Sequence, residues 1–153
     1  MKLITGKLLD ETSLRAKNSP RLRMNYNIHD DLNDPVNRLL NAMEPGTYIR
    51  PHRHSTPPKN ESTVLLRGSL EVLIFDDRGH ITHRELLSSA TGLYAVDIPP
   101  GTWHGLVVKE AGTVVYEIKT GPYCPIAEAD WAPWSPPPGD ASAVAGYLEM
   151  IGR

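Results

Sequence analysis

Short apolar runs recur along most of this chain, and turn residues interrupt them at regular intervals. The runs are rich in Val, Ile, Leu, Thr and Tyr, and Pro-Gly, Arg-Gly and similar pairs separate them about every eight to twelve residues. This rhythm is typical of an all-β domain. The runs predict strands at residues 36–43, 47–54, 61–67, 69–76, 80–87, 93–98, 103–108 and 113–119.

Residues 21–29 alternate strictly between polar and apolar side chains, which predicts a half-buried strand. The polar side can be the solvated face of an outer strand, which is the usual meaning of such alternation. It can also line a concave surface, where arginines, asparagines and a histidine would donate hydrogen bonds to a phosphate or to sugar hydroxyls. On the second interpretation, the candidate substrate-binding residues are Arg21, Arg23, Asn25 and His29.

The two ends of the chain depart from this β pattern. Residues 10–18 begin with acids and contain no Gly or Pro, which predicts a short helix. Residues 122–138 are rich in Pro, Trp and Ala, which excludes a regular central strand and predicts an ordered strap across the β-domain. Asp140 can then cap a final helix in which apolar residues recur at helical spacing as far as Ile151.

Length and composition favour a single domain. The 153 residues, 40% of them apolar, suffice for one hydrophobic core. We therefore expect one domain over residues 1–153, with the barrel core at 21–120 and the strap and final helix at 121–153.

Charge and cysteine content argue against several classes of protein. The 16 basic and 18 acidic side chains are mixed along the chain, so no positive block is available to bind nucleic acid. Cys124 is the only cysteine, which excludes an internal disulfide and favours a reducing compartment. The apolar runs at the N-terminus are too short for a signal peptide or a membrane span. We expect a cytoplasmic protein with no nucleic-acid or membrane partner.

Two histidines separated by one residue, His52 and His54, lie in the most informative stretch of the sequence. In a strand, residues two apart point to the same side, so both imidazoles can face one point. Glu61 begins the next predicted strand and can add a carboxylate, while His104 follows a tight turn at 99–101. Three imidazoles and one carboxylate suit a single divalent transition metal such as Zn, Fe, Ni, Mn or Co.

Each candidate ligand also has a plainer interpretation. The histidine pair can be two exposed polar residues on an edge strand, and Glu61 can be an ion-pair partner of Lys59 or Arg53. The combination of the pair with Glu61 and His104 favours the metal interpretation.

Three further residues are candidates for catalytic roles. Tyr48 and Arg50 are expected on the same side of their strand as His52 and His54, where they would contact a substrate or the ligands. Lys59 lies in the loop before Glu61 and can act as a lid residue or proton donor, although an exposed loop lysine is the commoner case. The candidate catalytic residues are therefore Tyr48, Arg50 and Lys59.

The spacing of these residues resembles the two motifs of the cupins, Gly-x5-His-x-His-x3–4-Glu-x6-Gly and Gly-x5-Pro-x-Gly-x2-His-x3-Asn. The matching positions are Gly46, His52, His54, Glu61 and Gly68 in the first motif and Gly92, Pro99, Gly101 and His104 in the second. The chain departs from the pattern in a longer gap before Glu61, one extra residue before Pro99, and Val108 at the position of the final Asn. The resemblance implies a double-stranded β-helix, or jelly-roll barrel, that holds one metal ion.

A closer resemblance covers nearly the whole chain. Segments similar to the WbuC family of cupins are Arg-Leu-Arg-Met-Asn at 21–25, Asn-Arg-Leu-Leu-Asn-Ala at 37–42, Pro-His-Arg-His at 51–54, Lys-Asn-Glu at 59–61, Gly-Pro-Tyr at 121–123 and Ala-Pro-Trp at 132–134. That family is associated with gene clusters for O-antigen and related surface polysaccharides. The resemblance implies a metalloprotein with a carbohydrate-related role and does not name a reaction.

Two classes of function are consistent with these features. The protein can be a metal-dependent enzyme, either an isomerase or epimerase that polarises a carbonyl or an Fe-dependent dioxygenase. It can also be a binding or sensing module in which the metal grips a ligand or has a structural role. Several arginines near the predicted metal favour a small anionic or sugar-like ligand. The family type implies a homodimer.

Overall fold

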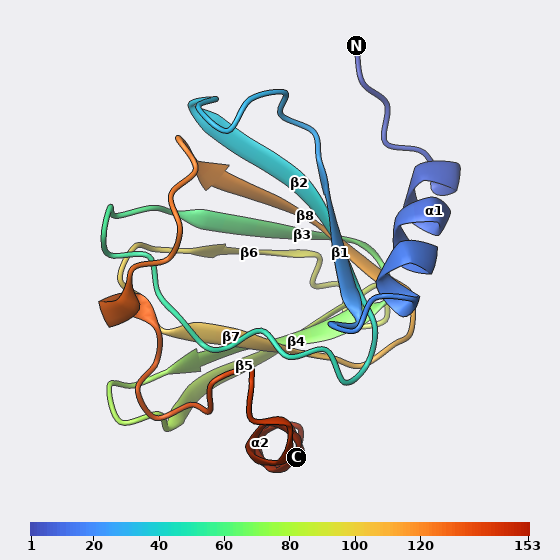
Figure 1. The fold of residues 1–153 in the computed structure, drawn as a ribbon. Helices are drawn as coiled ribbons and strands as arrows, with labels where there is room; N and C mark the ends of the chain where they lie inside the picture. The colour runs from blue at the N-terminus through green and yellow to red at the C-terminus, as the bar shows by residue number, and fades with distance from the viewer.

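The computed structural model describes residues 1–153 as two facing β-sheets with a helix near each end of the chain (Figure 1). One sheet has the strand order β1-β2-β8-β3-β6 and the other β5-β4-β7. Neighbouring strands are antiparallel, which gives the jelly-roll β-barrel expected from the sequence. The strands are β1 (Arg23–Asn27), β2 (Val36–Met43), β3 (Glu61–Arg67), β4 (Ser69–Phe75), β5 (Ile81–Ser88), β6 (Ala95–Ile98), β7 (His104–Val108) and β8 (Thr113–Thr120).

Most strand boundaries follow the apolar pattern closely. The predictions at 36–43 and 61–67 match β2 and β3 residue for residue, and those for β4 to β8 agree within two residues. β1 is shorter than predicted, because Leu22 has a φ of 55°, which breaks the extended backbone before Arg23.

The strand predicted at 47–54 does not form, and this segment is an extended chain with a single β-bridge at His52. Pro51 has no N–H group, so a continuous ladder through this position is not possible. Instead, the His52 N–H donates to the His104 carbonyl at 3.0 Å and the His104 N–H donates back to His52 at 2.9 Å. The segment therefore lies against the start of β7 and carries the histidine pair with it.

The last glycine of the first motif, Gly68, forms the corner at which the chain passes from one sheet to the other. Its φ is +80°, and a Cβ atom there would lie 2.8 Å from the Cα of Thr113. β3 and β4 can follow each other directly only with a glycine at this corner.

Each helix covers the outside of one sheet (Figure 1). α1 (Gly6–Lys17) begins after Thr5, whose hydroxyl accepts the Leu8 N–H, and so starts earlier than the predicted residue 10. α2 (Ala141–Ile151) begins after Asp140, which caps it as predicted. Neither helix has the length and apolar character that a membrane crossing requires.

The strap between β8 and α2 runs across one end of the barrel, from the five-stranded sheet to the three-stranded one (Figure 1). It contains one short 3-10 turn, η1 (Glu128–Asp130). The Asp130 carbonyl accepts the Arg53 N–H and the Ala132 N–H donates to the Pro51 carbonyl, each at 3.0 Å. The strap thereby holds the histidine segment from the side opposite β7.

Candidate metal centre

The inner face of the five-stranded sheet changes from apolar to charged along its strands. On β3 and β8, Leu65 pairs with Val115 towards one end, and both belong to the apolar cluster between the sheets. At the other end Glu61 pairs with Lys119, and both line a cavity. The barrel is thus filled at one end and hollow and polar at the other.

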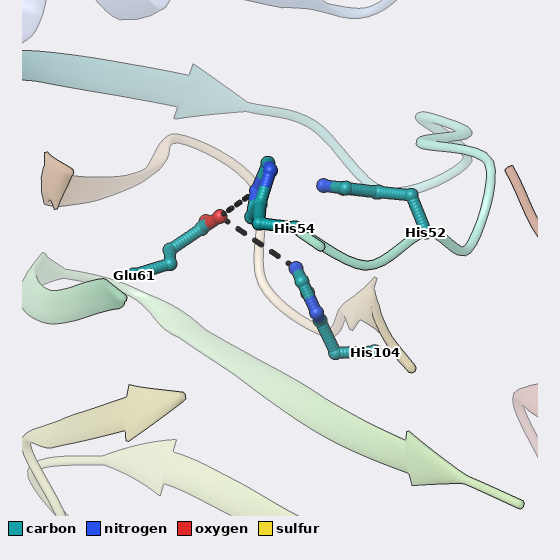
Figure 2. Close-up of side chains that lie close together, drawn as sticks. All are labelled: His52, His54, Glu61 and His104. Carbon is teal, nitrogen blue, oxygen red and sulfur yellow. Dashed lines mark hydrogen bonds and ion pairs between the residues drawn. The ribbon is translucent and has the colours of Figure 1, made fainter. Parts of the chain in front are cut away.

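Four potential metal ligands converge at this polar end (Figure 2). His52 and His54 come from the extended segment, Glu61 from the first residue of β3 and His104 from the first residue of β7. The ligand atoms of all four lie within 4.8 Å of one another. The structure therefore brings together every residue that the sequence predicts as a ligand.

The backbone fixes the tautomer of two of the histidines. Nδ1 of His52 lies 3.0 Å from the Arg50 carbonyl, and Nδ1 of His104 lies 2.9 Å from the Thr102 carbonyl. A carbonyl oxygen only accepts, so each Nδ1 carries the hydrogen and each Nε2 keeps its lone pair. Nε2 of His104 is buried and has no hydrogen-bond partner. An imidazole held by a carbonyl, with its other nitrogen left open, is the arrangement that metal-binding histidines adopt.

The charge states of His52 and Glu61 also suit a metal. Burial, followed by the repulsion from His104, lowers the pKa of His52 well below its usual value, which favours the neutral imidazole. Burial by itself would raise the pKa of Glu61. The nearby Lys119 charge, together with the hydrogen bond from His54 and the proximity of His104, outweighs burial, so the pKa of Glu61 falls well below its usual value. Neutral imidazoles and an ionised carboxylate are the forms that coordinate cations.

Three nitrogens surround one oxygen of Glu61. Its Oε2 lies 2.8 Å from Nε2 of His54 and 3.6 Å from Nε2 of His104 (Figure 2). Nζ of Lys119 lies 3.1 Å from the same oxygen. The loop of residues 55–60, longer than in the cupin motif, therefore still delivers Glu61 to the histidines. The alternative pairing of Glu61 with Lys59 or Arg53 is not found among its contacts.

A buried polar network behind the ligands was not foreseen from the sequence. Lys119 also contacts Glu117 at 3.0 Å, and Nδ2 of Asn41 donates to Glu117 at 2.7 Å. Burial would lower the pKa of Lys119, but Glu117 and Glu61 raise it above its usual value and keep the ammonium charged. The sequence contains a signal for this network, because Glu117 and Lys119 lie two residues apart on β8 and so on the same side of the strand. It was missed because the polar side of an alternating strand is usually exposed, whereas here it faces the inside of the barrel.

The polar face of β1 also points into this space. A cavity of about 240 Å³ is lined by Arg21, Arg23 and Asn25 together with three of the candidate ligands. Arg23 is anchored by a 2.7 Å hydrogen bond from Nη1 to the Tyr48 carbonyl. Burial and the neighbouring Arg21 lower its pKa from the usual value. His29 lies two residues beyond the end of β1 and lines an adjoining cavity, with its Nδ1 held by the backbone of Arg38.

Tyr48 and Arg50 do not share the cavity with the histidines, which corrects the expectation from strand alternation. The Tyr48 hydroxyl donates to the Pro136 carbonyl at 2.8 Å, and Nη2 of Arg50 donates to the Ala132 carbonyl at 2.9 Å. Both side chains therefore hold the strap. The expectation failed because the segment before His52 is not a regular strand, so Ile49 lines the cavity in their place.

Lys59 is buried, unlike a typical loop lysine. Its ammonium donates a hydrogen bond to the Pro122 carbonyl in the strap. It lines a third cavity together with His54, Lys119 and Cys124. Its position ties the loop to the strap, and its side chain is not directed freely towards solvent.

The barrel topology and this ligand set define the class of protein, a cupin-type β-barrel with a candidate centre of three histidines and one glutamate. The chain belongs to the family described as Domain of unknown function (DUF6016), whose model matches residues 4–87. A comparison with curated proteins gives no significant match.

Solved structures with low sequence identity share the fold. KdgF from a Halomonas species is 18% identical with a TM-score of 0.53, over 69% of this chain and 84% of that one. A cupin 2 domain-containing protein from Halorhodospira halophila is 17% identical with a TM-score of 0.53, over 86% and 81% of the two chains. Oxalate oxidase in complex with the substrate analogue glycolate is 16% identical with a TM-score of 0.53, over 88% and 75%. These likenesses establish the cupin fold.

Proposed function

We propose that the protein is a metal-dependent cupin that binds the acid group of a small, sugar-related metabolite. One observation carries the proposal: the open Nε2 atoms of His52 and His104 and the Glu61 carboxylate share a cavity with Arg21 and Arg23. Convergent neutral imidazoles and a carboxylate select a divalent cation, while guanidinium groups select an anion.

The residues have separate tasks under this proposal. His52, His54, Glu61 and His104 would hold one Zn, Fe, Ni or Mn ion, and such an ion supplies a Lewis acid for an oxygen of the ligand. Arg21 and Arg23 would attract the acid group, in line with their positions on the cavity wall. Lys119 keeps Glu61 ionised and oriented through its 3.1 Å contact.

The biological context we propose is the synthesis of surface polysaccharide of the O-antigen type. Its support is the resemblance to the WbuC family, which includes the arginine segment at 21–25 and the histidine segment at 51–54. Support for an acidic ligand comes from oxalate oxidase, which has the same fold and was solved with glycolate, a small hydroxy acid. The positions of Arg21 and Arg23 on the cavity wall agree with such a ligand.

A binding role without turnover is the second candidate. Besides the candidate ligand Glu61, the metal cavity contains one more carboxylate that could act as a general base, Glu117. Asn41 and Lys119 both bind this carboxylate. A carboxylate held in this way is a poor proton acceptor, which favours ligand binding alone. Turnover of a sugar acid by the metal-loaded protein, abolished by a chelator, would exclude this candidate.

Metal binding is tested by titrating chelator-treated protein with Zn²⁺, Mn²⁺, Ni²⁺ and Fe²⁺ in a calorimeter. We expect one ion per chain for at least one metal, with the affinity reduced by two orders of magnitude or more in His52→Ala and in His104→Ala, since each removes one ligand. His80→Ala is the matched control, because His80 is exposed and lies outside the cluster. Equal metal affinity in all three variants and the parent protein would refute the proposed centre.

A further inference from the structure

The metal cavity adjoins a larger cavity along the inner face of the five-stranded sheet. The larger cavity has a volume of about 720 Å³, within the range of roughly 300–1,000 Å³ that is typical of small-molecule sites. The two cavities have Asn25, Glu117 and Lys119 in common, so they meet beside the candidate ligands. We call the larger cavity the side groove, and its lining includes Asn25, Asn27, Asn37, Glu117 and Tyr123.

Asn41, which lines the metal cavity and contacts the shared residue Glu117, has one hydrogen-bonding atom that the protein does not use. Its Nδ2 faces Glu117 at 2.7 Å, and a carboxylate can only accept, so the amide cannot be turned around. Its Oδ1 is then left buried without a partner in the wall of the metal cavity. Because a buried acceptor without a partner is unfavourable, this atom favours a ligand that brings a donor.

The lining around this position supplies both hydrogen-bond donors and acceptors. Glu117 and the Oδ1 atom of Asn41 accept, Lys119 donates, and the side-chain amides of Asn25 and Asn27 can do both. A hydroxyl group both donates and accepts, so several hydroxyls on one ligand can satisfy such a lining. A phosphate or carboxylate only accepts and cannot satisfy Asn41 Oδ1. Glu117 and Lys119 also neutralise each other, which favours an uncharged ligand here.

An aromatic ring completes the lining of the side groove. Tyr123 is 56% exposed, and its backbone N–H donates to the Leu32 carbonyl at 2.7 Å, which fixes the start of the strap beside the loop that joins β1 to β2. An exposed ring in a polar groove offers a flat apolar surface against which the C–H face of a sugar ring can pack.

We propose that the side groove, together with Asn41, binds a hexose-sized sugar ring. Its hydroxyls donate to Asn41 and Glu117 and accept from Asn25 and Asn27, and Tyr123 covers one face of the ring. The inference deepens the proposed function and rests on it only for the position of the acid group, which lies at the metal while the ring extends into the side groove.

The test is a titration followed by backbone amide NMR shifts. Glucose, galactose, mannose and the uronic acid of each are added to metal-loaded and to chelator-treated protein, with acyclic sorbitol as the ligand that lacks a ring. We expect at least one hexose to shift amides of β1, β2 and β8 in both forms of the protein, and sorbitol to leave them unchanged. Tyr123→Ala should weaken this binding about three- to tenfold, the effect of losing one packed aromatic ring.

Tyr94→Ala is the matched control, because Tyr94 is 53% exposed and lies outside the side groove. The hexose affinity of this variant should equal that of the parent protein. Absence of hexose shifts in protein that binds metal would overturn the sugar site and leave the metal proposal intact. Equal binding by Tyr123→Ala and the parent would also overturn the sugar site. If a hexose shifts these amides but the protein binds none of the metals, the sugar site would be supported and the proposed metal-dependent function would be refuted.

Discussion

Asp130 in the strap holds the loop that separates His54 from Glu61. Its carboxylate accepts the Ser55 N–H at 3.0 Å, the Thr56 N–H at 2.9 Å and Nε of Arg53 at 3.0 Å. The residue is only 2% exposed. Three hydrogen bonds to one buried carboxylate make it the principal anchor between the strap and the candidate metal centre.

Replacing Asp130 with Ala should therefore destabilise the protein and weaken metal binding. The change leaves two backbone N–H groups and a guanidinium without their acceptor, and each lost partner of this kind costs about 1–3 kcal/mol. We expect a total loss of about 3–5 kcal/mol in the free energy of unfolding. For a chain of this length that corresponds to a fall of roughly 6–20 °C in the melting temperature. Metal affinity should fall about 10- to 100-fold, because the loop no longer holds Glu61 in place.

Thermal unfolding followed by circular dichroism measures the stability, and calorimetric metal titration measures the affinity. Glu128→Ala is the matched control, because Glu128 lies in the same 3-10 turn, is exposed, and makes no ion pair. It should leave both quantities unchanged. If Asp130→Ala melts within about 2 °C of the parent protein, or if Glu128→Ala loses as much stability, the anchoring role of Asp130 is wrong.

Two further predictions concern charged groups. Burial opposes ionisation of Asp130, but its hydrogen bonds outweigh burial and lower its pKa below the usual value of about 3.9. The stabilisation by Asp130 should then be complete above about pH 4 and disappear as the pH falls through the folded-state pKa. Urea unfolding should show that the stability gap between the parent and Asp130→Asn narrows below about pH 4, and a constant gap would contradict this. Lys119→Met removes the ammonium between Glu61 and Glu117, so it should destabilise the metal-free protein by about 3 kcal/mol. The loss should be smaller in metal-loaded protein, where the ion would neutralise Glu61. Thermal unfolding with and without chelator compares the two losses. Equal losses in both forms would show that the metal does not neutralise Glu61.

The strands were predictable where the chain signals them locally. Alternation and turn residues located β2 and β3 to the residue, because each strand carries its own apolar pattern and its own ends. The segment at 47–54 has the same local pattern. Its partners are the start of β7 and the strap, far away in sequence, and Pro51 prevents a continuous ladder, so no local pattern distinguishes it from a strand.

In the candidate site too, some residues were predictable from the sequence and others depend on the tertiary structure. Motif spacing predicted that His52, His54, Glu61 and His104 would come together, because the spacing reflects fixed positions at the ends of strands. The positions of Tyr48 and Arg50 were wrong, since they depended on a strand that does not form. Lys119 and Glu117 were missed, because only the closed barrel shows that the polar side of β8 is its inner side.

The two ends of the barrel are closed by different physical means. Between the sheets, apolar residues around Leu65 and Val115 close one end, and this contribution depends on temperature and little on pH. At the other end, Glu61 belongs to the five-stranded sheet and His104 to the three-stranded one, so an ion bound to both would tie the two sheets together. That tie depends on acid and on chelators, because both compete for the ligands. On the proposed function, the fold would thus have one permanent closure and one that responds to the supply of metal in its surroundings.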